Sequence, residues 1–171
     1  MNRRHLLGSL VAILSPQARA LYEPEPMALF RGLPGRWRGS LTYRDWSPPH
    51  GLVSLPCELF VALNSPSQAS LYFVFQDGPG KVVHSYDRWT VSEAGDTLAW
   101  ASGKDTSTYD LTPLPAAAGE TAVLLTRLQD GKTYRQRLRL GPKTLHIEKV
   151  EVEADGRESF RNRYEFARAD A

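Results

Sequence analysis

The amino-acid sequence predicts an all-β protein that folds as one closed, ten-stranded, antiparallel up-and-down β-barrel. From Arg36 onward, short stretches of alternating apolar and polar residues are separated by turn-forming residues roughly every eight to twelve positions. No stretch in this region has the apolar spacing of a long helix. Because ten consecutive strands leave two exposed edges unless the sheet closes, a barrel is the simplest arrangement.

Residues 1–20 have the pattern of a secretory signal peptide. Arg3 and Arg4 precede an apolar stretch that is too short to span a bilayer, and Ala18-Arg19-Ala20 is a small-x-small cleavage site. We therefore expect cleavage after Ala20 and a periplasmic or secreted protein. The paired arginines also resemble a twin-arginine signal, but the general secretory route is the favoured interpretation.

The composition indicates one soluble globular domain with few constraints on its partners. Of the 21 basic residues, three lie in residues 1–20, which contain none of the 19 acidic residues, so the mature chain has a formal charge of −1. This balance gives no indication of a nucleic-acid partner. Cys57 is the only cysteine, so we expect no internal disulfide and no lipid anchor. A freely soluble monomer is the expectation.

Turn signals divide the mature chain into an arm and a barrel domain. Residues 21–35 begin Pro-rich and continue as a short apolar turn, which predicts a short helix that caps one end of the barrel; a disordered neck is the alternative. The barrel domain spans residues 36–171, with two-residue hairpin turns at Asp130-Gly131 and Asp155-Gly156. The predicted strands are 36–44, 52–63, 69–76, 81–92, 96–102, 105–111, 120–129, 132–140, 144–153 and 157–168.

Counting residues across these turns tests the predicted meander. Across the first Asp-Gly turn, Leu125 falls opposite Gln136, and across the second, Leu145 falls opposite Phe166. The inner and outer faces therefore stay in register over four successive strands, which favours one continuous antiparallel sheet.

A stripe of arginines falls on the outer face of this sheet. Arg135, Arg137 and Arg139 alternate along one strand, and Arg137 falls beside Glu148 of the next. Contact with nucleic acid or an acidic partner is one interpretation. The favoured one is a solvated face with cross-strand ion pairs.

Two motifs resemble those of the lipocalin-like (calycin) barrels. The first strand begins with a Leu-x-Gly-x-Trp-x-Gly motif formed by Leu33, Gly35, Trp37 and Gly39, and the last strand, RNRYEFAR, is rich in aromatic and basic residues. The chain is similar to the ten-stranded fatty-acid-binding and nitrobindin-type members and to lipocalin-like bacterial proteins of unassigned function. This resemblance implies a barrel that binds a small hydrophobic or amphipathic molecule in its interior.

The resemblance also implies how the barrel closes. In this family a basic residue of the last strand covers the first-strand tryptophan, and here Arg168 falls next to Trp37 at one end of the barrel. We assign this pair a structural role, as a cation–π contact that closes the barrel. The opposite end is then the open one.

The candidate ligand-binding residues lie on predicted inward positions. Apolar residues face inward near the closed end, whereas polar, cationic and aromatic residues face inward toward the open end, as an amphipathic ligand would require. The alternative is that this mouth is simply solvated. The candidates are Tyr43, His84, Tyr86, Arg88, Trp100, Arg127, Tyr134, Gln136, Lys149, Asn162 and Tyr164.

His84 is the histidine of greatest interest. Counting across the turn at 77–80 places His84 opposite Phe73, with Tyr86 and Arg88 on the same inner face and Arg88 against Trp100. An inward imidazole could ligate haem or a metal, or hydrogen-bond a ligand; a histidine satisfied by its neighbours is the favoured alternative.

The haem-binding histidine and the carboxylate-binding Arg-x-Tyr motif of these relatives both lack a direct counterpart in this chain. Nitrobindin-type relatives bind haem through a histidine near the C-terminal strands, but His146 falls on the outer face, so no cofactor or metal is assigned and haem is a less favoured hypothesis. Fatty-acid-binding relatives hold a carboxylate with Arg-x-Tyr on the last strand, where this chain has Asn162-x-Tyr164. Arg127 and Lys149 could replace that arginine, so an anionic headgroup stays open.

Catalytic motifs are absent from the sequence. It contains no Gly-x-Ser-x-Gly elbow, His-Glu-x-x-His pair or phosphate-binding glycine loop, and Cys57 is expected to face inward as a small hydrophobe. An exported small-molecule binding protein is the leading interpretation. A structural or envelope interaction protein with a self-filled barrel is the alternative, and an enzyme is the least favoured.

Overall fold

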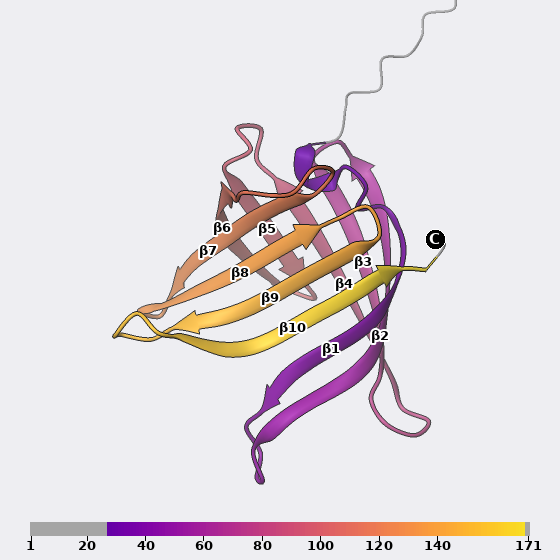
Figure 1. The fold of residues 1–171 in the computed structure, drawn as a ribbon, viewed down its shortest axis with the longest axis vertical. Coiled ribbons are helices and arrows are strands. Elements are labelled where there is room, and N and C mark those ends of the chain that lie inside the picture. Colours follow the sequence, from indigo (N-terminus) through magenta and orange to yellow (C-terminus); the bar gives the residue numbers. More distant parts are fainter. Residues whose placement is uncertain (1–26, 170–171) are drawn as a thin grey trace, which may run out of the picture.

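The computed structural model describes residues 27–169 as a closed barrel of ten antiparallel strands, in which chain neighbours pair and β1 pairs with β10 (Figure 1). This arrangement confirms the predicted fold class. The predicted signal peptide, its cleavage site and residues 21–26 lie outside the described residues. The strands are β1 (Gly35–Asp45), β2 (Gly51–Ser65), β3 (Gln68–Gln76), β4 (Val82–Val91), β5 (Thr97–Ser102), β6 (Asp105–Pro113), β7 (Thr121–Gln129), β8 (Lys132–Leu140), β9 (Thr144–Val152) and β10 (Glu158–Arg168).

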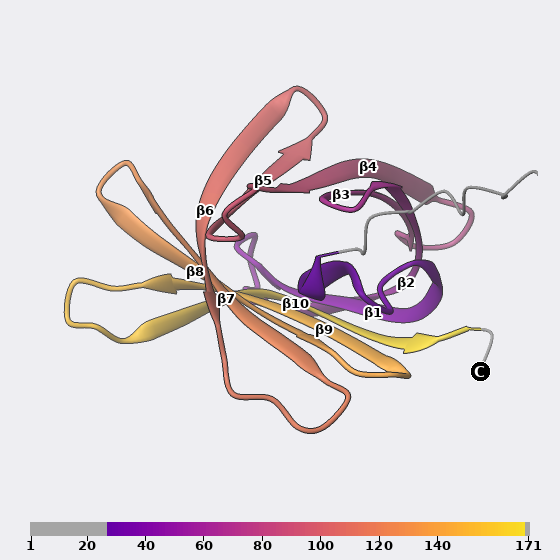
Figure 2. The same cartoon turned by 90° about the horizontal axis from the view of Figure 1, so that it is seen from above.

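The short helix expected before the first strand is a single 3₁₀ turn, η1 (Ala28–Phe30). Figure 2 shows this turn within the ring of strands. Phe30 and Leu33 are fully buried in the core, and the Met27 amide donates a 2.9 Å hydrogen bond to the Pro66 carbonyl between β2 and β3. The segment before β1 therefore plugs one end of the barrel.

Trp37 and Arg168 meet at this plugged end. They face each other in the β1–β10 pairing, and the Arg168 guanidinium carbon lies 4.0 Å from the indole centroid. Arg168 also donates hydrogen bonds to the carbonyls of Pro34 and Gly32, while the indole N–H of Trp37 donates to the Leu33 carbonyl at 2.9 Å. This cation–π contact and these hydrogen bonds tie β10 to the start of β1.

Apolar side chains fill the half of the barrel next to this plug. Strands β1 to β5 and β7 to β9 each contribute a fully buried residue, so the sheet packs against itself around a single core. The largest fully buried side chains are Trp37, Trp89, Phe30, Phe73, Leu33, Leu59, Leu71, Leu98, Leu125, Leu138, Leu145 and Ile147.

The predicted register of the last four strands is confirmed except beside the β9–β10 turn, where Phe160 pairs with Val150 rather than with Glu151. Leu125 pairs with Gln136 between β7 and β8, and Leu145 pairs with Phe166 between β9 and β10. The β7–β8 hairpin turns on Asp130-Gly131 as predicted. The β9–β10 loop instead contains five residues, in which the Glu153 amide donates to the Arg157 carbonyl at 2.8 Å, and a bulge at Arg161 restores the predicted pairing from Asn162 onward.

The predicted register between β3 and β4 is wrong by one residue. Phe73 pairs with Ser85 rather than with His84. The connecting loop contains five residues instead of four, because the Asp77 amide donates to the Lys81 carbonyl at 2.9 Å and Lys81 therefore belongs to the turn.

This shift reverses the faces of β4. Side chains alternate along a strand, so a one-residue slip moves each of them to the other face. His84, Tyr86 and Arg88 lie exposed on the outside, whereas Asp87 and Trp89 are buried inside. The prediction that the first three residues face the interior is therefore wrong.

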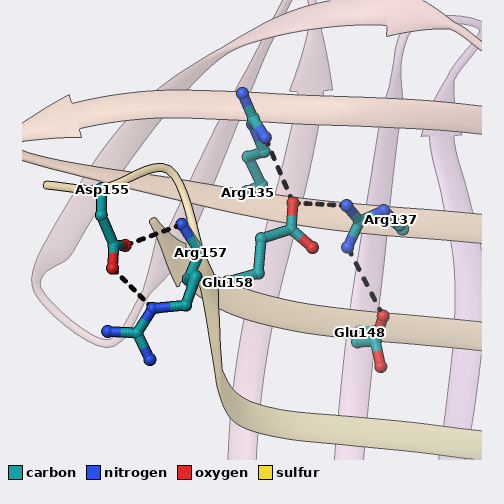
Figure 3. A network of polar contacts seen from close by, with 6 residues as sticks. All are labelled: Arg135, Arg137, Glu148, Asp155, Arg157 and Glu158. Carbon is teal, nitrogen blue, oxygen red and sulfur yellow. Dashed lines mark hydrogen bonds and ion pairs between the residues drawn. The ribbon is translucent and has the colours of Figure 1, made fainter. Parts of the chain in front are cut away.

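The arginine stripe on β8 forms ion pairs, as the favoured interpretation predicts. Arg137 contacts Glu158 at 2.5 Å and Glu148 at 3.6 Å, and Arg135 contacts Glu158 at 3.2 Å (Figure 3). In the adjacent β9–β10 turn, Asp155 accepts hydrogen bonds from the backbone and the side chain of Arg157. This outer face thus consists of strands joined by charge pairs.

Acid is expected to weaken this network. The hydrogen bond from Arg137, helped by Arg135, holds the pKa of Glu158 below its usual value of 4.5. A lowered folded-state pKa adds stability that is complete above the usual value and is lost as the pH falls through the folded-state value. Urea unfolding between about pH 6 and pH 3 should show a shallower acid loss for Glu158→Gln than for the wild type. Glu93 is exposed and forms no ion pair within the described chain, so Glu93→Gln is the control. An unchanged slope in Glu158→Gln would contradict the prediction.

Candidate functional site

A polar cavity of about 230 Å³ lies inside the barrel toward the end opposite Trp37. Its wall comes from β5 to β10, and the β7–β8 and β9–β10 turns at this end project toward the lower left of Figure 1. The predicted residues that line it are Trp100, Arg127, Gln136, Lys149, Asn162 and Tyr164. Sequence reasoning left out the remaining lining residues as candidates: Ser102, Asp105, Ser107 and Tyr109.

Arg127 is held in place by neutral groups. Its guanidinium donates to the Ser107 hydroxyl and to the Gln129 side-chain carbonyl, and its central carbon lies 5.3 Å from the Tyr109 ring centroid and 5.8 Å from that of Tyr134. Its buried Nε has no hydrogen-bond partner. Within the described residues, no carboxylate pairs with this cation.

Lys149 brings a second cation to the same cavity. Its ammonium lies 5.3 Å from the Tyr134 ring centroid and forms no hydrogen bond or ion pair with any described residue. Burial lowers the pKa of Lys149, and the positive charges of Arg127 and Arg161 lower it further. The ring of the predicted candidate Tyr134 thus contacts both cations, Arg127 and Lys149.

Glu151 is a buried carboxylate on β9 that already forms ion pairs. It is 5% exposed and contacts Lys132 at 2.6 Å and Arg161 at 3.2 Å. A register shift between Phe160 and Asn162 forms a bulge at Arg161, whose guanidinium lies 5.2 Å from the Trp46 ring centroid. The hydrogen bond from Lys132 lowers the pKa of Glu151.

Asp87 is a second buried carboxylate, and three neutral donors satisfy it. Ser85 and Ser102 donate to Oδ1 at 3.1 and 2.6 Å, and the Trp100 indole N–H donates to Oδ2 at 2.9 Å. Trp100 therefore contacts Asp87 and the buried Trp89, at a centroid distance of 4.8 Å, instead of the predicted Arg88. A correct count across the Asp77–Lys81 loop would have found Asp87.

Tyr164 lines the polar cavity and lies next to a second, mostly apolar hollow, called here the apolar shelf. The second hollow has a volume of about 190 Å³, lies on the inner side of the open end and includes the predicted candidate Tyr43. Tyr164 lies 6.4 Å from Phe75 of this hollow, centroid to centroid, and burial raises the pKa of its phenol. The hollow is lined by Leu41, Tyr43, Leu55, Phe75, Asp77 and Val83.

The outward residues of β4 form contacts on the surface. His84 Nδ1 lies 2.7 Å from the Tyr72 hydroxyl, and the Tyr86 hydroxyl lies 2.8 Å from Ser70 Oγ. None of the described histidines lines the polar cavity, and no cluster of three or more metal-binding side chains occurs in residues 27–169. His84 therefore does not supply the inward histidine on which the haem hypothesis was based.

Cys57 is buried, as expected for a small hydrophobe. Burial raises the pKa of the Cys57 thiol to about 12, so it stays protonated at neutral pH. It has no thiolate available for nucleophilic chemistry.

The described residues form a closed, ten-stranded, antiparallel up-and-down barrel with a cavity at its open end, and solved structures share this fold. No family model matches the chain, and no curated protein matches it. The chain is similar to Rv2717c from M. tuberculosis, with a TM-score of 0.60, 12% identity, and coverage of 84% of this chain and 99% of that one. It is also similar to the S-type phycobiliprotein lyase CPES from Guillardia theta, with a TM-score of 0.59, 10% identity, and coverage of 83% and 90%. At these identities the likeness shows a shared fold. Across residues 27–169, no helix has the length and apolar character needed to cross a membrane.

Proposed function

We propose that this protein is an exported binding protein that holds a small amphipathic molecule at the open end of its barrel. The observation that carries the proposal is the polar cavity, in which hydrogen-bonding and cationic side chains converge against aromatic walls. A few convergent polar groups in a concave, partly aromatic site are typical of small-molecule sites.

Two different surfaces meet at the open end, which suits an amphipathic molecule. Arg127, Lys149 and Asn162 supply polar contacts on one side, and Leu55 and Phe75 belong to the apolar shelf on the other. Because apolar side chains fill the closed half, a ligand would lie at the mouth and not run through the length of the barrel.

A self-filled structural barrel is the second candidate. The packed half around Trp89 and Phe73 favours it, because much of the interior is already occupied. The two candidates differ in whether the open-end cavity takes up a molecule.

Native mass spectrometry of mature protein from the periplasm or medium distinguishes them. Ser107 lines the cavity and Thr108, its neighbour on β6, is exposed on the outside. We expect a bound species in the wild type and in Thr108→Trp, and its loss in Ser107→Trp, whose indole would occupy the cavity. A mass without ligand in all three proteins, with no uptake from a library of small amphipathic molecules, would favour the structural barrel. N-terminal sequencing of the same sample should begin at Leu21 if the protein is exported as predicted.

A further inference from the structure

The polar cavity contains two cations that form no ion pair with any carboxylate of residues 27–169. Arg127 donates to neutral oxygens of Ser107 and Gln129, and Lys149 has neither a hydrogen bond nor an ion pair with a described residue. Cations in partly buried sites are ordinarily paired, because burial of an unpaired charge is costly. A bound anion would supply the missing partner.

The carboxylates around the cavity do not fill this role. Glu151 is occupied by Lys132 and Arg161, and Asp87 accepts from three neutral donors. Asp105 lines the cavity but forms no ion pair with either cation in the described chain. The pair of cations is therefore available to a ligand.

The surroundings of the two cations favour a flat ligand over a flexible chain. Trp100, Tyr109 and Tyr164 line the cavity, and its volume of about 230 Å³ is suited to a single ring with one substituent. The Tyr109 and Tyr134 rings hold Arg127 in position, so the site is arranged before a ligand arrives.

We propose that this cavity binds a small aromatic carboxylate, with its acid group at Lys149 and Arg127 and its ring against Trp100 and Tyr164. The inference rests on the proposed function and names the chemical class of its ligand. A guanidinium and an ammonium together recognise a carboxylate through charge-assisted hydrogen bonds, and aromatic walls favour a ring by stacking or edge contacts.

Titration calorimetry with four probes tests this assignment. Benzoate is the predicted ligand class, benzamide removes the charge, cyclohexanecarboxylate removes the aromatic ring, and octanoate replaces the ring with a chain. We expect benzoate to bind at least about tenfold more tightly than each of the other three, with an affinity that falls as salt is raised.

Matched variants locate the acid group. Lys149→Met should weaken benzoate binding at least about tenfold, whereas Lys143→Met, at an exposed lysine before β9, should leave it unchanged. Lys149→Met should also unfold at a denaturant concentration equal to or higher than that of the wild type, because it removes a desolvated cation beside Arg127 and Arg161. A purely structural lysine would show the opposite shift.

Each outcome bears on a separate part of the assignment. Equal binding of benzamide and benzoate would overturn the anion site, and equal or tighter binding of octanoate or cyclohexanecarboxylate would overturn the aromatic class. If no probe binds while the wild type still carries a species that Ser107→Trp loses, the aromatic-carboxylate assignment fails and the binding function stands. If neither the probes nor any other molecule binds, both fail.

Discussion

Gly39→Ala is expected to lower the free energy of unfolding by about 4 kcal/mol or more, or to prevent folding. A Cβ atom at this position would lie 1.8 Å from the Glu165 carbonyl oxygen and 2.8 Å from the Phe166 Cα atom, both in the backbone of β10. Relief of that overlap requires β1 and β10 to separate at the seam that closes the barrel. Chemical denaturation followed by circular dichroism measures the effect.

Gly51→Ala is the matched control for this prediction. Gly51 lies at the start of β2, and nothing lies within 4 Å of the Cβ atom that the substitution would add. We expect a change of less than about 0.5 kcal/mol. Equal stability of Gly39→Ala and Gly51→Ala would show that the β1–β10 seam is looser than the structure describes.

Trp37→Ala is expected to lower the free energy of unfolding by about 3 to 5 kcal/mol. The substitution removes a fully buried indole, the surface on which Arg168 packs at 4.0 Å and the hydrogen bond to the Leu33 carbonyl. The segment before β1 and the end of β10 would both lose the indole that they contact. Urea unfolding monitored by far-UV circular dichroism gives the value.

Trp37→Phe separates the ring from its hydrogen bond. Phenylalanine keeps an aromatic face for Arg168 but cannot donate to the Leu33 carbonyl, so we expect a smaller loss of about 1 to 2 kcal/mol. A loss as large as that of Trp37→Ala would mean that the hydrogen bond, and not the cation–π contact, holds the closed end.

Local sequence signals located the strands of the barrel with small errors at their ends. The strand from Lys132 to Leu140, for example, is where the alternation of apolar and polar residues placed it. Asp130-Gly131 closes its hairpin in two residues, so the pairing of Leu125 with Gln136 could be counted directly.

The same counting failed where the loop length was ambiguous by one residue. The Asp77–Lys81 turn contains two glycines and a proline, and only its backbone hydrogen bond shows that Lys81 belongs to the loop. Because of this one extra loop residue, Asp87 faces the interior and His84 faces outward. Asp87 then accepts the hydrogen bond that orients Trp100.

The candidate site was predictable in part for a related reason. Arg127 lies on a strand whose inner face follows from the two-residue turn at Asp130-Gly131. Lys149 and Asn162 also face inward as predicted, because the bulge at Arg161 offsets the longer β9–β10 loop. Ser102, Asp105 and Ser107 were not chosen, because a short polar side chain near a turn has the same pattern whether it faces solvent or a cavity.

The sequence by itself determined the number of strands, their order and the end at which Trp37 and Arg168 meet, because alternation, turn chemistry and strand direction are local properties. Only the tertiary structure decided which face of β4 is buried and that an open cavity remains next to a packed core. It also decided that Glu151 forms ion pairs, whereas Lys149 and Arg127 form none with the described residues. Those features depend on register across a variable loop and on distances between side chains from different strands, which no local pattern encodes.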